Sequence, residues 1–378
     1  MSTQVIVTTI TWRERSFLTA ALVEEQKIEE LVLEPKEEQS YVGCVFRGVV
    51  DSVAKNIGGA YVDIGLSSPC FLPLGRHTHV SVSQPVLVQV TKDASGRKEP
   101  VLTTKISLSR RSVVVNRESE GLLFSKKLTG EQKSICTSWL KGEEHPYLIL
   151  VRTNAARASK AEFLQEVREL EQEMDDIVER YPGAAKGALL WRPAPFYISF
   201  LRDLYVPVEQ CLTNLPNVAE ELRKYCGDVV LRTDPGQSLT LEDRYGLRRE
   251  LDRLANRQVF LKSGAFLVIE QTEAFVSIDV NSGKCLRGRI PEETYRKVNL
   301  EAAAEIARQL RLRNLSGAIL VDFITLQNED HKQELIDVMR KLIKRDHIHT
   351  EVVDLTPLGI MEILRQKVRK PLAETLGV

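Results

Sequence analysis

The chain has 378 residues, which is too long for one ordinary hydrophobic core and predicts two or three packed domains. Its hydrophobic content of 43% and charged content of 28% are typical of a folded globular protein and exclude a low-complexity chain. The 52 Lys and Arg residues balance 52 Asp and Glu residues, so no overall basic field indicates a polyanionic partner. Any site for a polyanion must therefore come from local segregation of charge.

Targeting signals and metal-binding cysteine patterns are missing from the sequence. No apolar segment has the length of a signal peptide or of a membrane-spanning helix, so we expect a cytoplasmic protein. The six cysteines form no C-x-x-C pair, which predicts buried thiols in a reducing compartment. They are Cys44, Cys70, Cys136, Cys211, Cys226 and Cys285.

The first part of the chain has a β-type pattern. Residues 4 to 33 predict two or three short strands, with a polar turn at Trp12 to Arg15. From Tyr41 to Ser109, short β-type runs separated by Gly and Pro predict a small closed barrel. The predicted runs are 43–53, 59–64, 70–74, 85–90 and 101–108.

The middle of the chain changes to a helical pattern between residues 122 and 186, with apolar side chains at three- and four-residue steps. These side chains are Leu164, Val167, Leu170, Met174 and Ile177. Residues 191 to 257 mix strand-like and helical pieces, and their charge-rich end from Glu242 predicts a solvated helix face.

The last third predicts an α/β layer with a largely buried sheet. The expected strands are 265–270, 275–280, 318–324 and 348–353. We expect three helices here: one opened by Pro291, one capped by Asn328 that runs to Arg345, and a final one that Pro357 starts.

Two carboxylates interrupt apolar strands of this layer. Asp279 shares a strand face with Ser277 and Asn281, and Asp322 lies inside an apolar run. Such carboxylates can hold a hard divalent ion, which polarises water and neutralises charge that grows on phosphorus. The alternative is structural, since each Asp could cap a strand end or pair with an arginine.

The predicted barrel offers aromatic and basic side chains near the Gly58-Gly59 turn. Tyr61 and Phe71 could stack on unpaired bases while Arg47 and Lys98 track phosphates, or both rings could be core residues. Three basic groups in the last third could contact RNA, form solvated faces or pair with Glu residues four positions away on a helix. They are Arg308, Arg311 and Arg313; Lys341, Lys344 and Arg345; and Arg365, Lys367, Arg369 and Lys370.

Long stretches resemble the catalytic core of ribonucleases E and G. They are residues 264–283 and 299–313, followed by Gly317 and Val321 to Phe323. The resemblance implies a multidomain α/β fold in which an RNase H-like subdomain is interrupted by an OB-fold RNA-binding barrel and a 5′-sensor region, followed by a DNase I-like catalytic subdomain. The implied ranges are 1–39 and 191–257 for the RNase H-like parts, 40–109 for the OB-fold, 110–190 for the sensor and 258–378 for the catalytic subdomain.

The resemblance also assigns roles to residues. Asp279 and Asp322 match its magnesium ligands, and Asn281 matches an asparagine that places the scissile phosphate. Tyr61, Phe71 and Lys98 match its RNA-binding surface. Arg152 and Thr153, with Val114, match its 5′-monophosphate sensor, whereas Arg110 stands where the family often has glycine. The structural alternative is that Arg152 and Thr153 simply end a strand.

The resemblance implies a magnesium-dependent endoribonuclease that cleaves single-stranded RNA to 5′-phosphate and 3′-hydroxyl ends, in rRNA processing and mRNA decay. The family's Cys-Pro-x-Cys element is missing from this sequence, so we expect no zinc, and the resemblance leaves a homodimer or homotetramer open. The alternatives are a catalytically weak RNA-binding protein and a phosphodiesterase that acts on DNA.

Overall fold

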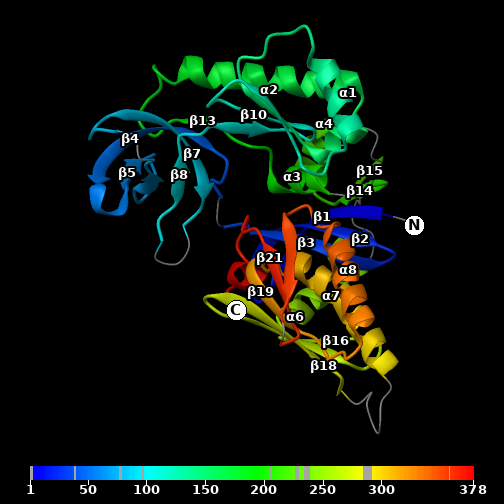
Figure 1. The fold of residues 1–378 in the computed structure, drawn as a ribbon. Helices are drawn as coiled ribbons and strands as arrows, with labels where there is room; N and C mark the ends of the chain where they lie inside the picture. The colour runs from blue at the N-terminus through cyan, green and yellow to red at the C-terminus, as the bar shows by residue number, and fades with distance from the viewer. Residues whose placement is uncertain are drawn as a thin grey trace. The chain divides into compact units, whose positions relative to one another are not determined.

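The computed structural model describes residues 3–37, 40–75, 79–94, 98–204, 206–225, 230–233, 239–283, 292–356 and 358–378 (Figure 1). The chain divides into two compact units. The first combines Met1–Glu38 with Phe196–Val378, and the second is Gln39–Pro195. Among the described residues, none of the helices combines the length and apolar character needed to cross a bilayer.

The first unit begins with a mixed sheet whose strand order is β15-β14-β1-β2-β3. β1 (Thr3–Trp12), β2 (Arg15–Glu24) and β3 (Lys27–Pro35) are antiparallel, which confirms the predicted strands and the polar turn after Trp12. Arg13 and Glu14 have φ values of 45° and 68° in that turn. The parallel strands β14 (Gln210–Thr213) and β15 (Val230–Thr233) extend the sheet from β1.

Four short helices accompany this mixed sheet: α3 (Phe196–Asp203), α4 (Pro216–Tyr225), α5 (Leu241–Arg244) and α6 (Leu247–Leu254). The charge-rich run from Glu242 forms α5 and α6, but one side of it is not solvated. Leu247, Glu250, Leu251 and Leu254 of α6 are buried. A helix can carry both a buried stripe and a charged face, so a charge run alone underestimates its packing.

The second sheet of this unit has the strand order β16-β17-β18-β19-β21-β20. Its strands are β16 (Gln258–Phe260), β17 (Phe266–Gln271), β18 (Phe275–Asn281), β19 (Gly317–Asp322), β20 (Thr350–Leu355) and β21 (Ile360–Arg365). The helices α7 (Glu292–Leu312) and α8 (Glu329–Ile343) pack side by side and share a core with one face of this sheet (Figure 1). The opposite face we call the open face.

The predicted strands and the two long helices of this region are confirmed. Asn328 caps α8, and its side chain accepts a hydrogen bond from the Asp330 N–H at 2.8 Å. The predicted helix after Pro357 is wrong: Pro357 itself lies outside the described residues, and residues 360–365 form β21. Met361, Ile363 and Arg365 are buried there, a period of two that suits a strand. A short helix, α9 (Leu372–Leu376), follows.

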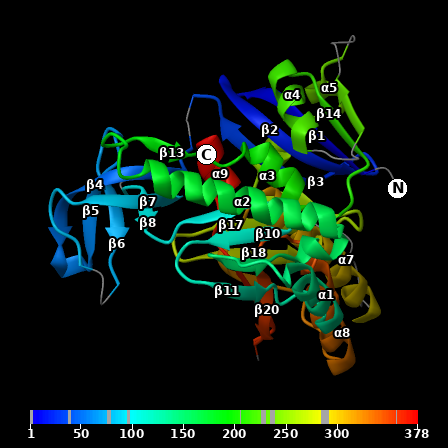
Figure 2. The same ribbon diagram turned by 90° about the horizontal axis from the view of Figure 1, so that it is seen from above.

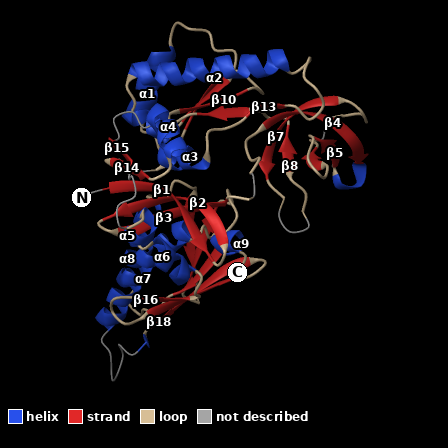
Figure 3. Ribbon diagram, turned by 180° about the vertical axis from the view of Figure 1, so that it is seen from behind, coloured by secondary structure: helices blue, strands red, loops and turns tan. Residues whose placement is uncertain are grey.

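In the second unit, a closed barrel confirms the prediction. β4 (Val45–Ala54), β5 (Gly59–Asp63), β6 (Cys70–Pro73), β8 (Val101–Thr103) and β7 (Pro85–Lys92) pair in that order, and β7 pairs back to β4. Figure 3 shows β4, β5, β7 and β8 of this barrel grouped together. The β6–β8 pair is parallel and the other barrel pairs are antiparallel. This topology is consistent with an OB-fold. A 3-10 turn (Lys55–Ile57) follows β4. A further strand, β13 (Leu189–Trp191), pairs with the first residues of β4.

A smaller sheet, with strand order β11-β12-β10-β9, completes this unit. Its strands are β9 (Ser107–Ser109), β10 (Val113–Asn116), β11 (Gly121–Phe124) and β12 (Leu148–Val151), with the 3-10 turn Thr153–Arg157 directly after β12. The long helix α2 (Lys160–Arg180) runs along β10, and α1 (Gly130–Leu140) packs beside it (Figure 2). The predicted helical pattern is confirmed for α2, although Phe163 replaces Leu164 among its fully buried residues. The prediction is wrong for β11 and β12, which are strands inside or at the edge of the range 122 to 186 that was expected to be helical.

The thiols of Cys44, Cys70, Cys136 and Cys211 are buried, as predicted. Burial raises the pKa of the Cys70 thiol to about 11, which keeps it protonated and unreactive at neutral pH. Cys226 and Cys285 lie outside the described residues.

Candidate active site

Asp279 and Asp322 occupy directly paired positions on neighbouring strands. β18 and β19 run parallel, and their register sets Asp279 opposite Asp322. The residues beside them, Ile278 and Val321, point into the core, so both carboxylates point to the open face, where both are exposed. Paired strands lie about 4.8 Å apart, which brings two such side chains within joint reach of one ion. We call this pair the acidic dyad.

Asn281 adjoins the acidic dyad along β18. Its Nδ2 donates a hydrogen bond to Asp279 Oδ2 at 2.6 Å. Period-two geometry also places Ser277 on this face, on the other side of Asp279 and opposite Leu320 of β19. The structure therefore brings together Asp279, Asn281 and Asp322, the three site residues that the sequence singled out in this region.

The donor set suits a hard divalent cation. Magnesium is usually held by one or two carboxylates, with water and substrate phosphate completing its octahedral shell. Within the described residues, no cluster of three or more His, Cys, Asp or Glu side chains could hold a metal ion. A site of two carboxylates, which leaves coordination positions for phosphate oxygens, agrees with the ligand set that magnesium prefers and needs no larger cluster of ligands.

Several further acids on the open face were missed by the sequence reasoning, among them Glu270 of β17, which lies opposite Ser277. Glu362 of β21 pairs with Leu320, and Asp354 of β20 pairs with Glu362, one cross-strand row away from the acidic dyad. Ile360 lies directly opposite Asp322. The alternation of buried and open positions in 360–365 was the available signal, and the Pro357 helix prediction obscured it.

The barrel brings Tyr61 and Phe71 together on its outer surface. They are direct partners across β5 and β6, with ring centroids 5.8 Å apart, and both are half-buried. A Cβ on Gly59 would lie 2.3 Å from Phe71 Cε2, so glycine is required for the ring to lie over that strand. The two rings are therefore not core residues.

The two cations expected near these rings lie on different segments of the chain. Lys98 is exposed, two residues before Pro100, whose carbonyl accepts a hydrogen bond from the Phe71 N–H at 2.8 Å. Arg47 lies half-buried on β4. Of the two, Lys98 is the residue that the chain path brings toward the aromatic pair.

Arg152 and Thr153 lie where β12 ends and the following 3-10 turn begins. Arg152 Nη1 donates to the Arg110 carbonyl at 3.0 Å, and the Thr153 hydroxyl lies 2.9 Å from Ser125 Oγ. Val114 pairs with Leu150, the residue two before Arg152, on the outward side of β10. The structure thus gathers the predicted sensor residues at one end of this sheet.

The side chain of Arg110 is directed to α2. Its guanidinium hydrogen-bonds Glu173, and its Nε lies 3.7 Å from Glu169 Oε2. The backbone carbonyl of Arg110 accepts the hydrogen bond from Arg152. Two carboxylates on a neighbouring helix therefore hold the long side chain of Arg110.

Arg308, Arg311 and Arg313 are not available to RNA, contrary to one alternative for this basic group. Their exposed fractions are 7%, 8% and 8%, because α7 packs against β3 as well as against its own sheet. Arg308 donates to Glu250 at 2.6 Å and to Glu305 at 2.8 Å, and Arg311 donates to Glu29 at 3.0 Å. These arginines are structural.

Arg365 is also structural, with an exposed fraction of 2%. It donates to Asp346 at 2.7 Å and to the Leu315 carbonyl at 3.0 Å. Arg345 is bound to Glu24 at 2.7 Å. Lys341, Lys344, Lys367 and Lys370 are exposed, so an RNA contact from them stays a prediction.

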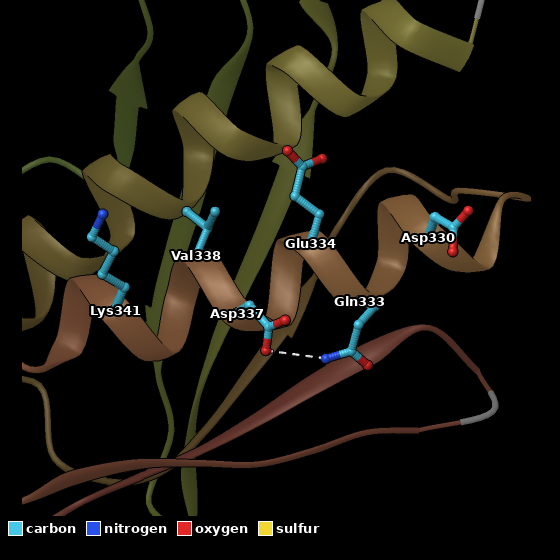
Figure 4. A pocket seen from close by; sticks show the side chains of 6 residues that line it. All are labelled: Asp330, Gln333, Glu334, Asp337, Val338 and Lys341. Carbon is cyan, nitrogen blue, oxygen red and sulfur yellow. Dashed lines mark hydrogen bonds between the residues drawn. The ribbon is translucent and has the colours of Figure 1, made fainter.

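An open hollow of 460 Å³ lies along α8, apart from the acidic dyad (Figure 4). It is lined by Asp330, Gln333, Glu334, Asp337, Val338 and Lys341, and Gln333 donates to Asp337 at 3.1 Å. These residues form one stripe on the side of α8 away from the core residues Leu335 and Met339. Three carboxylates in that stripe, Asp330, Glu334 and Asp337, disfavour an anionic ligand such as RNA in this hollow.

This fold and site define a multidomain α/β protein in which two paired carboxylates, a donor set that suits a divalent cation, lie on an open sheet face. The model of the Ribonuclease E/G family matches residues 107–368, and the chain belongs to this family. The matched range contains the acidic dyad, Asn281 and the predicted sensor residues.

Several named proteins are similar over most of the chain. Ribonuclease G of Haemophilus influenzae is 29% identical over 94% of this chain and 78% of its own length. Ribonuclease G of Escherichia coli strain K12 is 27% identical over 92% of this chain and 77% of its own length. Ribonuclease E of a Nostoc species is 30% identical over 95% of this chain, but the match spans only 56% of that longer protein.

Proposed function

We propose that the protein is a magnesium-dependent endoribonuclease that cuts single-stranded RNA and leaves 5′-phosphate and 3′-hydroxyl ends. The observation that carries this proposal is the direct pairing of Asp279 with Asp322 on the open face, in a chain that belongs to the Ribonuclease E/G family. Maturation of ribosomal RNA and decay of messenger RNA are the cellular roles that we propose for such an activity.

Each residue of the site has a task in this mechanism. Asp279 and Asp322 hold the ion, which when bound supplies positive charge for the phosphate and lowers the pKa of water. Asn281 carries two amide hydrogens, and the one that it donates to Asp279 holds that carboxylate in place. The other is available to a non-bridging oxygen of the scissile phosphate.

The barrel supplies the single-strand binding surface in this proposal. Stacking on Tyr61 and Phe71 requires unpaired bases, because the faces of paired bases are covered in a duplex. Lys98 adds a positive charge that can attract the phosphate backbone of the RNA. The outward position of both rings supports this role, and the sequence tolerance of stacking suits an enzyme that acts on many RNAs.

Arg152, Thr153 and Val114 form the proposed 5′-monophosphate sensor. A guanidinium can grip phosphate through two donors while a hydroxyl adds a third. The Arg110 carbonyl and Ser125 already orient Arg152 and Thr153, respectively, which lowers the ordering cost of binding.

The subdomain assignment is also a proposal. The mixed order β15-β14-β1-β2-β3 supports an RNase H-like subdomain formed by residues 1–39 and 191–257. The barrel supports an OB-fold at 40–109, with a sensor region at 110–190. The sheet that carries the acidic dyad supports a DNase I-like subdomain at 258–378.

The decisive experiment is digestion of an unstructured RNA labelled at its 5′ end, with and without Mg²⁺, and then analysis of the product ends. We expect internal cuts only with Mg²⁺, with a 5′-phosphate on each downstream product. Cleavage that persists in a chelator, or products with 2′,3′-cyclic phosphate ends, would contradict the proposal. Equal cutting of a matched DNA strand would instead favour a general phosphodiesterase.

A further inference from the structure

An aromatic pair that no role above uses lies on the open face. Phe260 of β16 and Phe266 of β17 are direct cross-strand partners, with ring centroids 6.0 Å apart and an interplanar angle of 49°. Phe266 is half-buried, whereas Phe260 has an exposed fraction of 74% on an edge strand. A Phe ring with this exposure leaves much apolar area in water unless a ligand covers it.

The register places this aromatic pair beside the acidic dyad. Phe266 lies directly opposite Asn281, and Val268 lies directly opposite Asp279, across β17 and β18. One cross-strand row on the open face is therefore Phe260, Phe266 and Asn281, and the next contains Val268, Asp279 and Asp322. Two residues along a strand span about 6.6 Å, so the rings lie within the reach of one nucleotide from a phosphate at the dyad.

The ligand for such a surface needs a flat apolar part next to an anionic part. Asp279 and Asp322 would repel an anion by themselves, so a phosphate would bind beside them only with a divalent cation that these two carboxylates would hold. The rings at the adjoining row offer their faces to a planar group. A nucleotide combines both parts, whereas an acidic peptide lacks the planar group and a lipid chain lacks the shape for stacking.

We propose that Phe260 and Phe266 form a stacking subsite for the base of a nucleotide adjoining the scissile phosphate. This inference rests on the proposed ribonuclease function and adds a positioning element to it. The stacked base holds its phosphate over the acidic dyad, so the subsite aligns the bond to be cut. Every base has a π-face, so the subsite accepts all four, and purines gain more because their rings cover more area.

An RNA series with one abasic nucleotide moved stepwise across a single cleavage site tests this proposal. In the wild type, one abasic position next to the cut should lower kcat/KM by about 10-fold or more. In a Phe260→Leu/Phe266→Leu double variant, which keeps apolar volume but has no ring, intact RNA should be cut more slowly and the abasic penalty at that position should vanish. A penalty unchanged in the double variant would overturn the proposal.

Phe275→Ala is the matched control. Phe275 is also exposed and lies on the open face of β18, but it lies on the far side of Asp279 from the aromatic pair. We expect this variant to keep the abasic penalty at the wild-type position. Loss of the penalty in Phe275→Ala would assign the stacked base elsewhere and overturn the assignment to Phe260 and Phe266.

Two measurements separate this proposal from its alternatives. If the wild type does not cut intact RNA, the ribonuclease proposal fails, and the subsite is then tested by a Phe260→Trp variant. Quenching of the new tryptophan by a short oligonucleotide with Mg²⁺ supports the subsite, and unchanged fluorescence overturns it.

Sedimentation of the double leucine variant is the other measurement: a lower mass than the wild type would assign the pair to self-association and overturn the proposal.

Discussion

Asn281 Nδ2 lies 2.6 Å from Asp279 Oδ2, so the residue expected to place the phosphate also orients a proposed metal ligand. A partner that orients a ligand changes metal affinity when it is removed, commonly by 10- to 100-fold. Asn281→Ala should therefore raise the Mg²⁺ concentration for half-maximal cleavage and lower kcat. A Mg²⁺ titration of the cleavage rate checks this, and an unchanged half-saturation point would show that Asn281 acts on the substrate alone.

Asp279→Asn and Asp322→Asn should each abolish RNA cleavage. An amide keeps the size of the side chain but removes the charge that holds the cation, so RNA binding by the barrel should remain. Single-turnover cleavage and a separate binding assay measure the two effects. Glu351→Gln, an exposed acid on β20, is the control and should cut at the wild-type rate. A dyad variant that keeps more than a few per cent of activity would refute the metal assignment.

Phe71→Leu should weaken RNA binding without unfolding the barrel. Leucine still covers Gly59, but it lacks the π-face on which a base stacks. The loss expected for one stacked base is about 5- to 100-fold in the dissociation constant for a short single strand. Fluorescence anisotropy measures it, and Val82→Ala, which removes another exposed apolar side chain of this unit, is the control. Equal losses in both variants would indicate general apolar contact.

Arg152→Ala should remove the preference for a 5′-monophosphate. The ratio of cleavage rates on monophosphorylated and hydroxylated RNA should fall to about one, while cutting of the hydroxylated RNA stays unchanged. The control is Arg168→Ala, because Arg168 is an exposed arginine of α2 that pairs with Glu143 at 2.6 Å. If the ratio persists in Arg152→Ala, the sensor does not lie at the end of β12.

The Arg365–Asp346 pair should make stability fall in acid. Burial alone would raise the pKa of Asp346, but the Arg365 guanidinium and the Ile348 N–H outweigh burial and hold that pKa below its ordinary value. A lowered folded-state pKa adds stability above the unfolded-state pKa, and this contribution is lost as the pH falls through the folded-state value. The free energy of unfolding should therefore decrease below about pH 4.

Asp346→Asn tests this pair directly, because it leaves the buried Arg365 charge without its counter-ion. The expected loss at neutral pH is about 3–5 kcal/mol, measured by urea unfolding. Glu24→Gln, which breaks the exposed pair with Arg345, is the control and should cost less than about 1 kcal/mol. A similar loss in both variants would mean that burial does not set the strength of the Arg365–Asp346 pair.

Local patterns in the sequence predicted much of this molecule. The alternation along 275–281 placed Ser277, Asp279 and Asn281 on one face before any partner strand was known, because side chains in a strand alternate regardless of what lies beside it. The apolar steps of α2 and the Asn328 cap of α8 are equally local. The spacing of Gly and Pro between short β runs likewise predicted the barrel.

Only the tertiary structure decided which of these faces meet. Arg308 is buried because α7 packs against β3 as well as its own sheet, and β21 pairs with β19 after a proline that by itself also suits a helix. The alignment of Asp279 with Asp322, and of Phe266 with Asn281, depends on strand register. Strand register and burial depend on the free energy of packing between segments that are far apart in the chain. The local periodicity of one segment carries no information about that packing.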